Sequence, residues 1–263
     1  MSDPQTGYEA PPSRFIVSNL EKQFASNGSA AVVLDDISFD VADAEFVCIA
    51  GKSGAGKSTL LKILAGFEPP SSGKLVLDGH AVSGPGPTRC FVFQEDALFP
   101  WLTVGENIGF GLKQQGISGR QIDKEVDRFL HLVGLSEYKS YLPREISGGM
   151  KQRVALARVL ILNPGVLLMD EPFASLDAQT RHEMQGLLLK LWKELGHIIL
   201  FVTHDLTEAL TLADRIIVMD DQAGCIKEIV TVDLPRPRQR DNPDFMGRYR
   251  RLNQLLFGGS DPF

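Results

Sequence analysis

One stretch of nine residues constrains this chain more than any other. Residues 51–59, Gly-Lys-Ser-Gly-Ala-Gly-Lys-Ser-Thr, match the phosphate-binding loop pattern G-x-x-x-x-G-K-[ST] at every fixed position. The apolar run Phe46–Ala50 precedes the loop, and apolar residues at helical spacing, from Leu60 to Leu64, follow it. This is the strand, loop and helix context that the pattern requires. The sequence therefore predicts an α/β fold with a nucleoside triphosphate site.

The residue types of this loop suit phosphate. Glycines allow the backbone to wrap closely around an anion, and the N–H groups that open the next helix point toward it. Lys57 supplies positive charge for the outer phosphates, and the Ser58 hydroxyl is placed to ligate Mg²⁺. A glycine-rich turn without nucleotide is the alternative, which the Lys-Ser-Thr ending and both flanks disfavour. The expected nucleotide-binding residues are Gly51, Lys52, Ser53, Gly54, Ala55, Gly56, Lys57, Ser58 and Thr59.

Length and composition agree with one large α/β core. The chain has 263 residues, of which 43% are hydrophobic, which leaves room for an inserted subdomain. No apolar stretch approaches a membrane span, and the N-terminus lacks the regions of a signal peptide, so a cytoplasmic protein is expected. A formal net charge of −6 argues against a broad nucleic-acid-binding face. The three cysteines, Cys48, Cys90 and Cys225, have neither disulfide nor metal spacing and are expected to be reduced.

The pattern along the chain predicts three regions after a polar lead, residues 1–13, that is expected to be disordered. The first region is rich in strands. The second, about residues 97–162, turns helical, with a capping box at Thr103 and Glu106, and is expected to be an inserted helical subdomain. The third alternates strands and helices, which indicates a largely parallel sheet. The expected strands are Phe15–Leu20, Ile37–Val41, Phe46–Ala50, Leu75–Leu77, Arg89–Phe93, Val166–Met169, Ile198–Thr203 and Ile216–Met219, and the expected late helices are Ala178–Leu195 and Leu206–Ala213.

A second motif ends the apolar strand 166–169 with two carboxylates. The carboxyl edge of a parallel sheet is where ligands bind in such folds. Asp170 can hold Mg²⁺, directly or through water, and Glu171 can orient and deprotonate an attacking water. A solvated acidic strand end is the alternative for a lone pair of this type, but the phosphate-binding loop in the same chain favours a catalytic role.

A third motif opens a helix with a serine N-cap and two glycines, Ser147, Gly148 and Gly149. Such a start can bind an anion, although a well-capped helix is the alternative. With this motif the chain resembles the ATP-binding cassette (ABC) ATPases, whose signature is Leu-Ser-Gly-Gly-Gln, from Phe15 to about Val232. Two positions differ, since Ile146 replaces the leucine and Met150 the glutamine. The serine and both glycines are intact, so a working site is expected.

The resemblance implies a P-loop NTPase (RecA-like) core over residues 14–232, with an N-terminal antiparallel β-subdomain, the helical signature subdomain, and ATP and Mg²⁺ as cofactors. It implies that Gln94 senses Mg²⁺ and the attacking water, that Asp177 belongs to the D-loop and that His204 contacts the γ-phosphate. Phe24 would stack on adenine, unless it is a core residue of the first sheet. The catalytic residues would be Glu171, His204, Lys57 and Gln94. The Mg²⁺ ligands would be Ser58, Gln94 and Asp170. The signature residues Ser147, Gly148 and Gly149 would act on the ATP of a second subunit, which is an identical copy or a paralogue.

Three segments, residues 93–104, 148–153 and 170–177, are similar to the importer ATPases for nitrate, sulfonate, taurine and bicarbonate. This implies a peripheral protein on the cytoplasmic face of a bacterial inner membrane, bound to a permease that receives solute from a periplasmic or lipid-anchored binding protein. Docking is expected near Leu98, Phe99, Pro100 and Trp101, with ordinary subdomain core as the alternative. An exporter ATPase and a non-transport ABC ATPase of DNA repair or translation remain the rival functions, and the solute is open.

Residues 233–263 form a basic, proline-containing tail. Such a tail is most often a solvated extension, which is the expectation here. Contact with anionic lipid or with the permease is the alternative.

Overall fold

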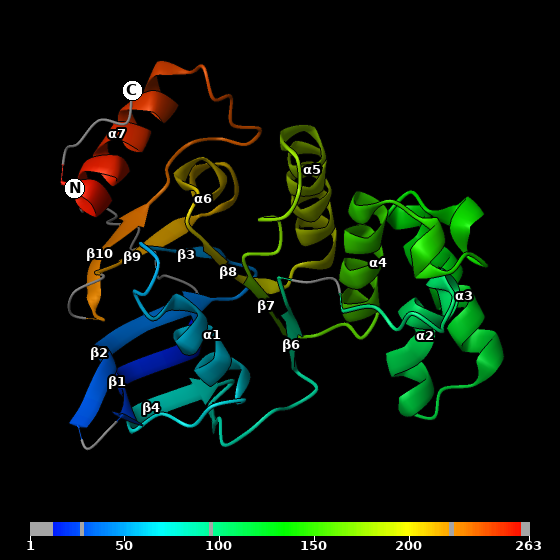
Figure 1. Ribbon diagram of the computed structural model, residues 1–263, viewed down its shortest axis with the longest axis horizontal. Helices are drawn as coiled ribbons and strands as arrows, with labels where there is room; N and C mark the ends of the chain where they lie inside the picture. The colour runs from blue at the N-terminus through cyan, green and yellow to red at the C-terminus, as the bar shows by residue number, and fades with distance from the viewer. Residues whose placement is uncertain (1–12, 27–28, 95–96, 221–223, 259–263) are drawn as a thin grey trace, which may run out of the picture.

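The structure is a computed structural model that describes residues 13–26, 29–94, 97–220 and 224–258 (Figure 1). The lead at 1–12, the middle of the predicted turn at 220–224 and the last five residues of the tail lie outside the described residues. The described part of the chain contains two sheets, helices that pack on them, and a separate group of helices. The three cysteines are free thiols, and among the described residues no helix is long and apolar enough to cross a membrane.

The first sheet is antiparallel and has the strand order β2-β1-β4-β5. Strands β1 (Ser13–Ser26) and β2 (Ser29–Ala42) pair over most of their length, and β4 (Ser72–Leu77) and β5 (His80–Ala81) complete the sheet. The predicted strands lie inside these longer ones. The ends that the pattern missed carry exposed residues such as Val32, so period-two alternation is weak there.

The second sheet has six strands in the order β10-β9-β3-β8-β7-β6. Strands β6 (Arg89–Val92), β7 (Val166–Asp170), β8 (Ile198–Thr203), β3 (Phe46–Ala50) and β9 (Arg215–Met219) are parallel, and β10 (Ile226–Thr231) is an antiparallel edge. The three central strands are almost wholly buried, as continuous apolar runs predict. All five parallel strands end at one edge of the sheet, where the loops carrying the predicted site residues begin.

Each face of this sheet has its own core. Val47 and Ile49 pack with α1 (Lys57–Ala65) and the antiparallel sheet, whereas Phe46 and Cys48 pack on the opposite face. That opposite face is covered by α5 (Ala178–Leu195), α6 (Leu206–Leu212) and α7 (Pro243–Phe257). The α/β fold with an antiparallel N-terminal subdomain is confirmed.

The helical region extends to one side of the six-stranded sheet (Figure 1). It contains α2 (Val104–Gln114), α3 (Gly119–Leu132) and α4 (Gly148–Leu160), with short 3₁₀ turns at Ser136–Tyr138 and Pro143–Glu145. The predicted capping box is present, because Thr103 accepts a hydrogen bond from the Glu106 N–H and Glu106 accepts one from the Thr103 N–H.

The C-terminal segment corrects the prediction of a solvated extension, which is wrong for residues 233–257. The Arg238 guanidinium donates to the carbonyl oxygens of Leu234, Leu210, Ala213 and Val232 at 2.6–3.0 Å. Burial lowers the pKa of Arg238 to about 10. Helix α7 then buries one apolar face in the core, through Phe245, Leu252 and Leu256. The arginines fold inward because they satisfy carbonyl groups near the end of α6 that have no partner within the helix.

Candidate active site

The phosphate-binding loop connects β3 to α1, and its glycines are required by close contacts. A Cβ on Gly51 would lie 3.1 Å from the Met219 carbonyl oxygen, and one on Gly56 would lie 2.7 Å from that of Val33. Gly56, with φ of +85°, is the N-cap of α1 and offers no side chain to the first N–H groups of the helix. These N–H groups and the helix dipole therefore suit an anion in the loop.

Lys57 is buried at the first turn of α1 and folds back onto its own loop. Its Nζ donates to the carbonyl oxygens of Gly51 and Lys52, at 2.8 Å each. Burial lowers the pKa of Lys57, and the nearby charges of Glu171 and Asp170 act in the opposite direction. A phosphate oxygen that entered the loop would compete with the two carbonyl groups for an ammonium that is already in place.

Ser58 and Asp170 meet where α1 and β7 approach each other. The Ser58 Oγ donates to Asp170 Oδ1 at 2.9 Å. Burial raises the pKa of Asp170, the hydrogen bond from Ser58 lowers it and the charge of Glu171 raises it further. The described residues contain no cluster of three or more His, Cys, Asp and Glu side chains that could hold a metal ion. Mg²⁺ is usually held by one or two carboxylates together with substrate phosphates, so a hydroxyl beside one carboxylate fits this ion.

Glu171 and His204, predicted from separate strands, lie together. His204 Nδ1 and Glu171 Oε2 are 2.9 Å apart, at the ends of the neighbouring strands β8 and β7. Glu171 has a left-handed φ of +46°, and its N–H donates to the Val202 carbonyl at 3.1 Å. The His204 side chain is 63% exposed and that of Glu171 24%, so the pair is open to solvent. A carboxylate held by an imidazole at an open sheet edge can accept a proton from water.

The signature motif and the D-loop form a second pair of helix starts. Ser147 caps α4 by accepting from the Met150 N–H at 3.3 Å, and Asp177 caps α5 by accepting from the Thr180 N–H at 2.9 Å. The hydrogen bonds from Thr180 lower the pKa of Asp177. A Cβ on Gly149 would lie 2.6 Å from Thr180 Cγ2, so the two starts touch. Figure 1 shows α4 well apart from α1, and the described structure does not join these two starts into one site within a chain.

Phe24 and Gln94 complete the predicted nucleotide site. Phe24 is 39% exposed, so it is not a core residue of the first sheet, and the Lys22 Nζ lies 4.7 Å from its ring centroid. Gln94 follows the end of β6 by two residues, and its side chain is exposed. Both side chains are therefore accessible for the contacts that the resemblance implies.

The predicted docking segment, Leu98–Trp101, is a folded turn. Trp101 is 73% exposed and packs on Phe99, which in turn packs on Phe110 with ring centroids 4.6 Å apart. Asn107, which sequence reasoning missed, is fully buried and organises the turn. Its side chain accepts from the Phe99 N–H and donates to the carbonyl oxygens of Phe99, Leu102 and Thr103. Asn107 could have been recognised as a polar residue on the apolar face of the predicted helix that begins after Thr103, because a buried polar side chain there needs hydrogen-bond partners.

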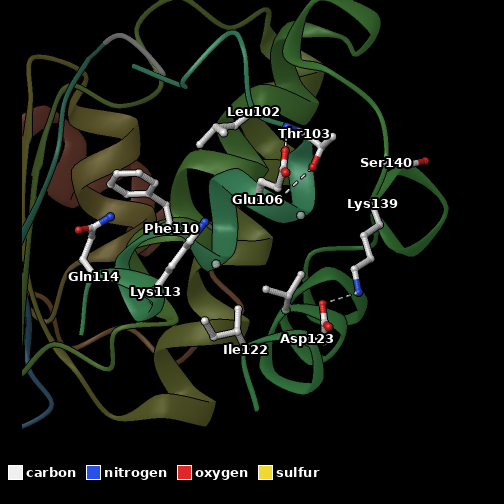
Figure 2. A pocket seen from close by; sticks show the side chains of 13 residues that line it. Leu102, Thr103, Glu106, Phe110, Lys113, Gln114, Ile122, Asp123, Lys139 and Ser140 are labelled. Carbon is white, nitrogen blue, oxygen red and sulfur yellow. Dashed lines mark hydrogen bonds and ion pairs between the residues drawn. The ribbon is translucent and has the colours of Figure 1, made fainter. Parts of the chain in front are cut away.

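A cavity of about 670 Å³ opens beside this turn, between α2, α3 and residues 139–140 (Figure 2). Phe110 and Leu102 line it together with Val126 and Ile122. Four charged side chains also line it, namely Glu106, Lys113, Asp123 and Lys139. The predicted docking segment is connected to this apolar hollow by Leu102, which follows it in the chain, and by Phe110, on which Phe99 packs.

The loop after β3 and the carboxylates after β7 define a nucleoside triphosphatase of the P-loop class. The ABC transporter family matches residues 34–174. The taurine import ATP-binding protein TauB of Roseobacter denitrificans is 48% identical over 249 residues, which cover 92% of this chain and 93% of TauB. The nitrate import ATP-binding protein NrtD of Synechocystis sp. is 42% identical over 251 residues, 92% of this chain and 94% of NrtD. The chain belongs to the ABC transporter family, as its motifs predicted.

Two further similarities agree with this assignment. The aliphatic sulfonates import ATP-binding protein SsuB of Bacillus cereus is 40% identical over 244 residues, 92% of this chain and 96% of SsuB. A dimeric structure of the ATP-binding cassette MJ0796 in a post-hydrolysis state, bound to ADP and Pi, superimposes with a TM-score of 0.74 at 30% identity. It covers 84% of this chain and 100% of the other. The chain is therefore an ATPase of this family.

Proposed function

We propose that the chain is the ATP-hydrolysing subunit of an ABC importer, which powers uptake of a small anion or organic solute through a separate membrane permease. One geometric observation carries the ATPase part: the phosphate loop, the Ser58–Asp170 pair and the Glu171–His204 pair lie along one sheet edge. The import direction and the solute class, nitrate, sulfonate, taurine or bicarbonate, are supported by relatives that are import ATP-binding proteins.

In this proposal each residue acts on ATP from the position described. The loop amides and Lys57 bind the outer phosphates, and Phe24 stacks on adenine. Ser58, Asp170 and Gln94 would hold Mg²⁺, which would supply positive charge to the phosphate oxygens. Glu171 accepts a proton from the attacking water. His204, whose Nδ1 lies 2.9 Å from Glu171 Oε2, holds the Glu171 carboxylate in place and contacts the γ-phosphate.

A second subunit supplies the signature residues. Ser147, Gly148 and Gly149 lie apart from the phosphate loop of their own chain, so we infer that they close over the ATP of a partner, either an identical copy or a paralogue. Asp177 caps α5, whose Thr180 meets the start of α4, and would lie in this interface. The dimeric structure of MJ0796 supports such a pairing.

The permease partner would dock on the helical region, with Leu98, Phe99, Pro100 and Trp101 directly before Leu102 in the chain, and Leu102 lines the cavity in Figure 2. A mostly apolar hollow with a few charged groups suits an amphipathic helix of a membrane protein. The chain would then lie at the cytoplasmic face of a bacterial inner membrane, as a peripheral subunit, and an external binding protein would meet the permease from the other side.

The Glu171→Gln variant tests this function. We expect ATP turnover to fall by roughly 10² to 10⁴-fold, because a proton acceptor of this kind contributes about that much. ATP binding should persist and an ATP-bound dimer should accumulate. Tagged Glu171→Gln protein, purified from detergent-solubilised native membranes with ATP and Mg²⁺, should recover a multi-span permease identifiable by mass spectrometry.

The matched control is Glu194→Gln, an exposed position on α5, which should hydrolyse ATP normally and give no trapped dimer. Recovery of ribosomes or DNA-bound proteins in place of an integral membrane protein would overturn the transport proposal. Recovery of a permease of an export system would overturn its direction. Normal hydrolysis by Glu171→Gln would remove this residue from the mechanism.

A further inference from the structure

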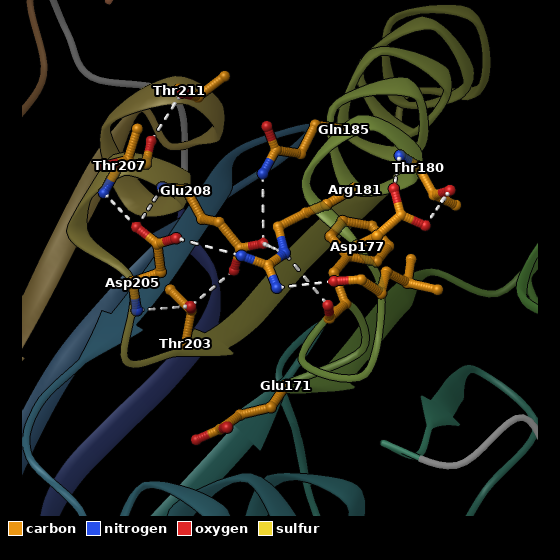
Figure 3. Close-up of polar contacts among 12 residues, drawn as sticks. Glu171, Asp177, Thr180, Arg181, Gln185, Thr203, Asp205, Thr207, Glu208 and Thr211 are labelled. Carbon is orange, nitrogen blue, oxygen red and sulfur yellow. Dashed lines mark hydrogen bonds and ion pairs between the residues drawn. The ribbon is translucent and has the colours of Figure 1, made fainter. Parts of the chain in front are cut away.

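A group of polar side chains around a buried carboxylate lies beside the candidate active site, outside the motifs described above (Figure 3). At its centre is Glu208, on the first turn of α6, which is 5% exposed. We call the group the Glu208 cluster; it consists of Glu208, Thr203, Gln185, Arg181, Asp205 and Arg240. A buried carboxylate costs free energy unless its oxygens accept hydrogen bonds, so we expect the neighbours of Glu208 to be donors.

Every polar partner within reach of the Glu208 carboxylate oxygens is a donor group. The Thr203 hydroxyl donates to Oε2 at 2.7 Å, the Gln185 amide donates to Oε1 at 3.2 Å, and the Arg181 Nε lies 3.9 Å from Oε1. An ionised carboxylate accepts hydrogen bonds from Thr203 and Gln185 and attracts the charge of Arg181, whereas an amide in its place would carry no charge and would turn an NH₂ group toward one of these partners. The cluster is therefore matched to a carboxylate at 208 and not merely to a side chain of that size.

Thr203 connects the cluster to the predicted γ-phosphate contact. It is the last residue of β8, and its Oγ also accepts from the Asp205 N–H at 3.0 Å. These two hydrogen bonds flank His204, so the backbone that carries the imidazole is held on both sides. Glu208 thereby fixes the strand end from which His204 reaches Glu171.

Arg181 connects the cluster to the D-loop. It donates to the carbonyl oxygens of Leu176, at 2.9 Å, and Phe173, at 3.3 Å. Both belong to the loop that joins Glu171 to Asp177. The same guanidinium lies between the carboxylates of Glu208 and Asp205, which is 3.8 Å away, so its orientation depends on them.

A small cavity of about 50 Å³ lies between the Glu208 cluster and the catalytic pair. Glu171 and His204 line one part of it, and Thr203, Asp205, Arg181 and Glu208 line the rest. The volume is enough for one or two water molecules, so little space separates the cluster from the reacting groups. Displacement of Glu208 would therefore be felt at the base and at the histidine together.

The C-terminal segment supplies the outermost member. Arg240 donates from Nη2 to Gln185 Oε1 at 3.1 Å, and the other end of the same amide donates to Glu208. An arginine has no acceptor and a carboxylate no donor, so the two neighbours fix the orientation of the Gln185 amide. Arg240, which lies outside the sequence motifs, thus helps to orient the Gln185 amide that donates to Glu208.

From these contacts we infer that Glu208 is a positioning residue for ATP hydrolysis, which holds His204 through Thr203 and the Glu171–Asp177 loop through Arg181, with Arg240 as its outer support. The inference rests on the proposed ATPase function. It assigns Glu208 no contact with ATP. Glu208 acts on the geometry of the residues that make that contact.

The test is Glu208→Gln in the full chain, with steady-state ATPase kinetics, ATP affinity by calorimetry and thermal unfolding measured together. We expect kcat to fall by roughly 10- to 100-fold, because displacement of a catalytic group by about 1 Å can cost that much. KM and ATP affinity should stay within about twofold, since the phosphate loop is untouched. Burial raises the pKa of Glu208, so its ionised form opposes folding at neutral pH, and the neutral amide should leave the melting temperature little changed.

Three further variants sharpen the result. Thr203→Val removes the hydroxyl, and in combination with Glu208→Gln it should lower kcat no further than Glu208→Gln alone, because the two act as one unit. Arg240→Ala should lower kcat less than Glu208→Gln does, and Arg240→Lys should restore it in part. The matched control is Thr211→Val, on the same helix, whose hydroxyl donates to the Thr207 carbonyl and not to the cluster. It should behave as the wild type.

Each outcome decides. A kcat of Glu208→Gln within twofold of the wild type would overturn the inference, as would parallel losses of kcat, ATP affinity and melting temperature, which would indicate a purely structural role. If Glu208→Gln does not fold, Thr203→Val is judged by the same criteria. A wild-type chain that neither binds nor hydrolyses ATP would overturn the proposed function itself, together with the inference that depends on it.

Discussion

The helix starts of α1 and α4 are both predicted to bind the phosphates of ATP, yet they are built differently. At α1 the N-cap is Gly56, which offers no side chain, and Lys57 is buried behind it. At α4 the N-cap is Ser147, which already satisfies the Met150 N–H, and both Ser147 and Gly148 are exposed. The α1 start has no side-chain acceptor for its N–H groups, whereas the α4 start has one for the Met150 N–H before any ligand arrives.

This difference teaches how two subunits could share one nucleotide. The α1 start, with orphan N–H groups and a buried ammonium, suits tight binding by a single chain. The α4 start can remain in water without cost, because its cap is internal. It is therefore stable in solvent until it contacts a nucleotide that a partner subunit has already bound. Substitutions at the two starts should separate affinity from assembly.

The largest effect is expected at the α1 start. Lys57→Ala should weaken ATP binding by the isolated chain by roughly 10- to 100-fold, because hydrogen bonds to charged groups contribute about 1.5–3 kcal/mol. Calorimetry measures this directly. Lys62→Ala, an exposed position in the last turn of α1, is the matched control and should bind ATP normally. Tight ATP binding by Lys57→Ala would remove the contrast between the two starts.

A smaller effect, of a different kind, is expected at the α4 start. In Gly149→Ala the new Cβ would lie 2.6 Å from Thr180 Cγ2, and overpacking of this kind costs about 1–3 kcal/mol. ATP-dependent dimerisation, measured by analytical ultracentrifugation, should weaken by roughly tenfold, since about 1.4 kcal/mol is a factor of ten. ATP affinity of the single chain should not change.

The same clash offers a rescue. Thr180→Ser removes Cγ2 and keeps the hydroxyl that donates to Asp177 at 2.7 Å. Gly149→Ala combined with Thr180→Ser should therefore recover much of the dimerisation. Failure of the rescue would place the defect in the nucleotide contact of Gly149 rather than in its packing on α5.

The smallest effect is expected from Ser147→Ala. Loss of an N-cap costs about 1 kcal/mol of stability, which urea denaturation can resolve. Thr103→Ala, which removes the cap of α2, should cost about as much and serves as the control. Only Ser147→Ala should also weaken the ATP-dependent dimer. Equal dimerisation by the two variants would mean that the Ser147 hydroxyl is a cap and nothing more.

The residues proposed to bind phosphate are recognisable in the sequence because their constraints are local. Gly51 and Gly56 are required by contacts under 3.2 Å with carbonyl oxygens, and Lys57 and Ser58 follow them directly in the chain. The carboxylates at 170 and 171 end a buried parallel strand, which a continuous apolar run reveals. That Glu171 and His204 would be 2.9 Å apart follows from the adjacency of β7 and β8, which the sequence alone does not fix.

The Glu208 cluster could not be predicted, because it joins three segments that are distant in sequence and each of its residues has an ordinary local context. Gln185 and Arg240 are 55 positions apart, and Glu208 reads as a solvent-facing residue in the first turn of a short helix. The arginines of the C-terminal segment were misjudged for a related reason. Charged residues are rarely buried, and the carbonyl groups that Arg238 satisfies are invisible in a linear pattern.

The contacts of Arg238 also limit where a further domain could be fused to this protein. Its guanidinium closes the end of α6, the helix that follows His204, from a position six residues past Val232, where the recognisable motifs stop. A chain cut at that point would leave carbonyl groups of α6 without their donor and would shed the apolar cover that α7 provides. A domain fused to this ATPase should therefore be attached after Phe257, because residues 233–257 pack on α6 and the sheet and do not form a free linker.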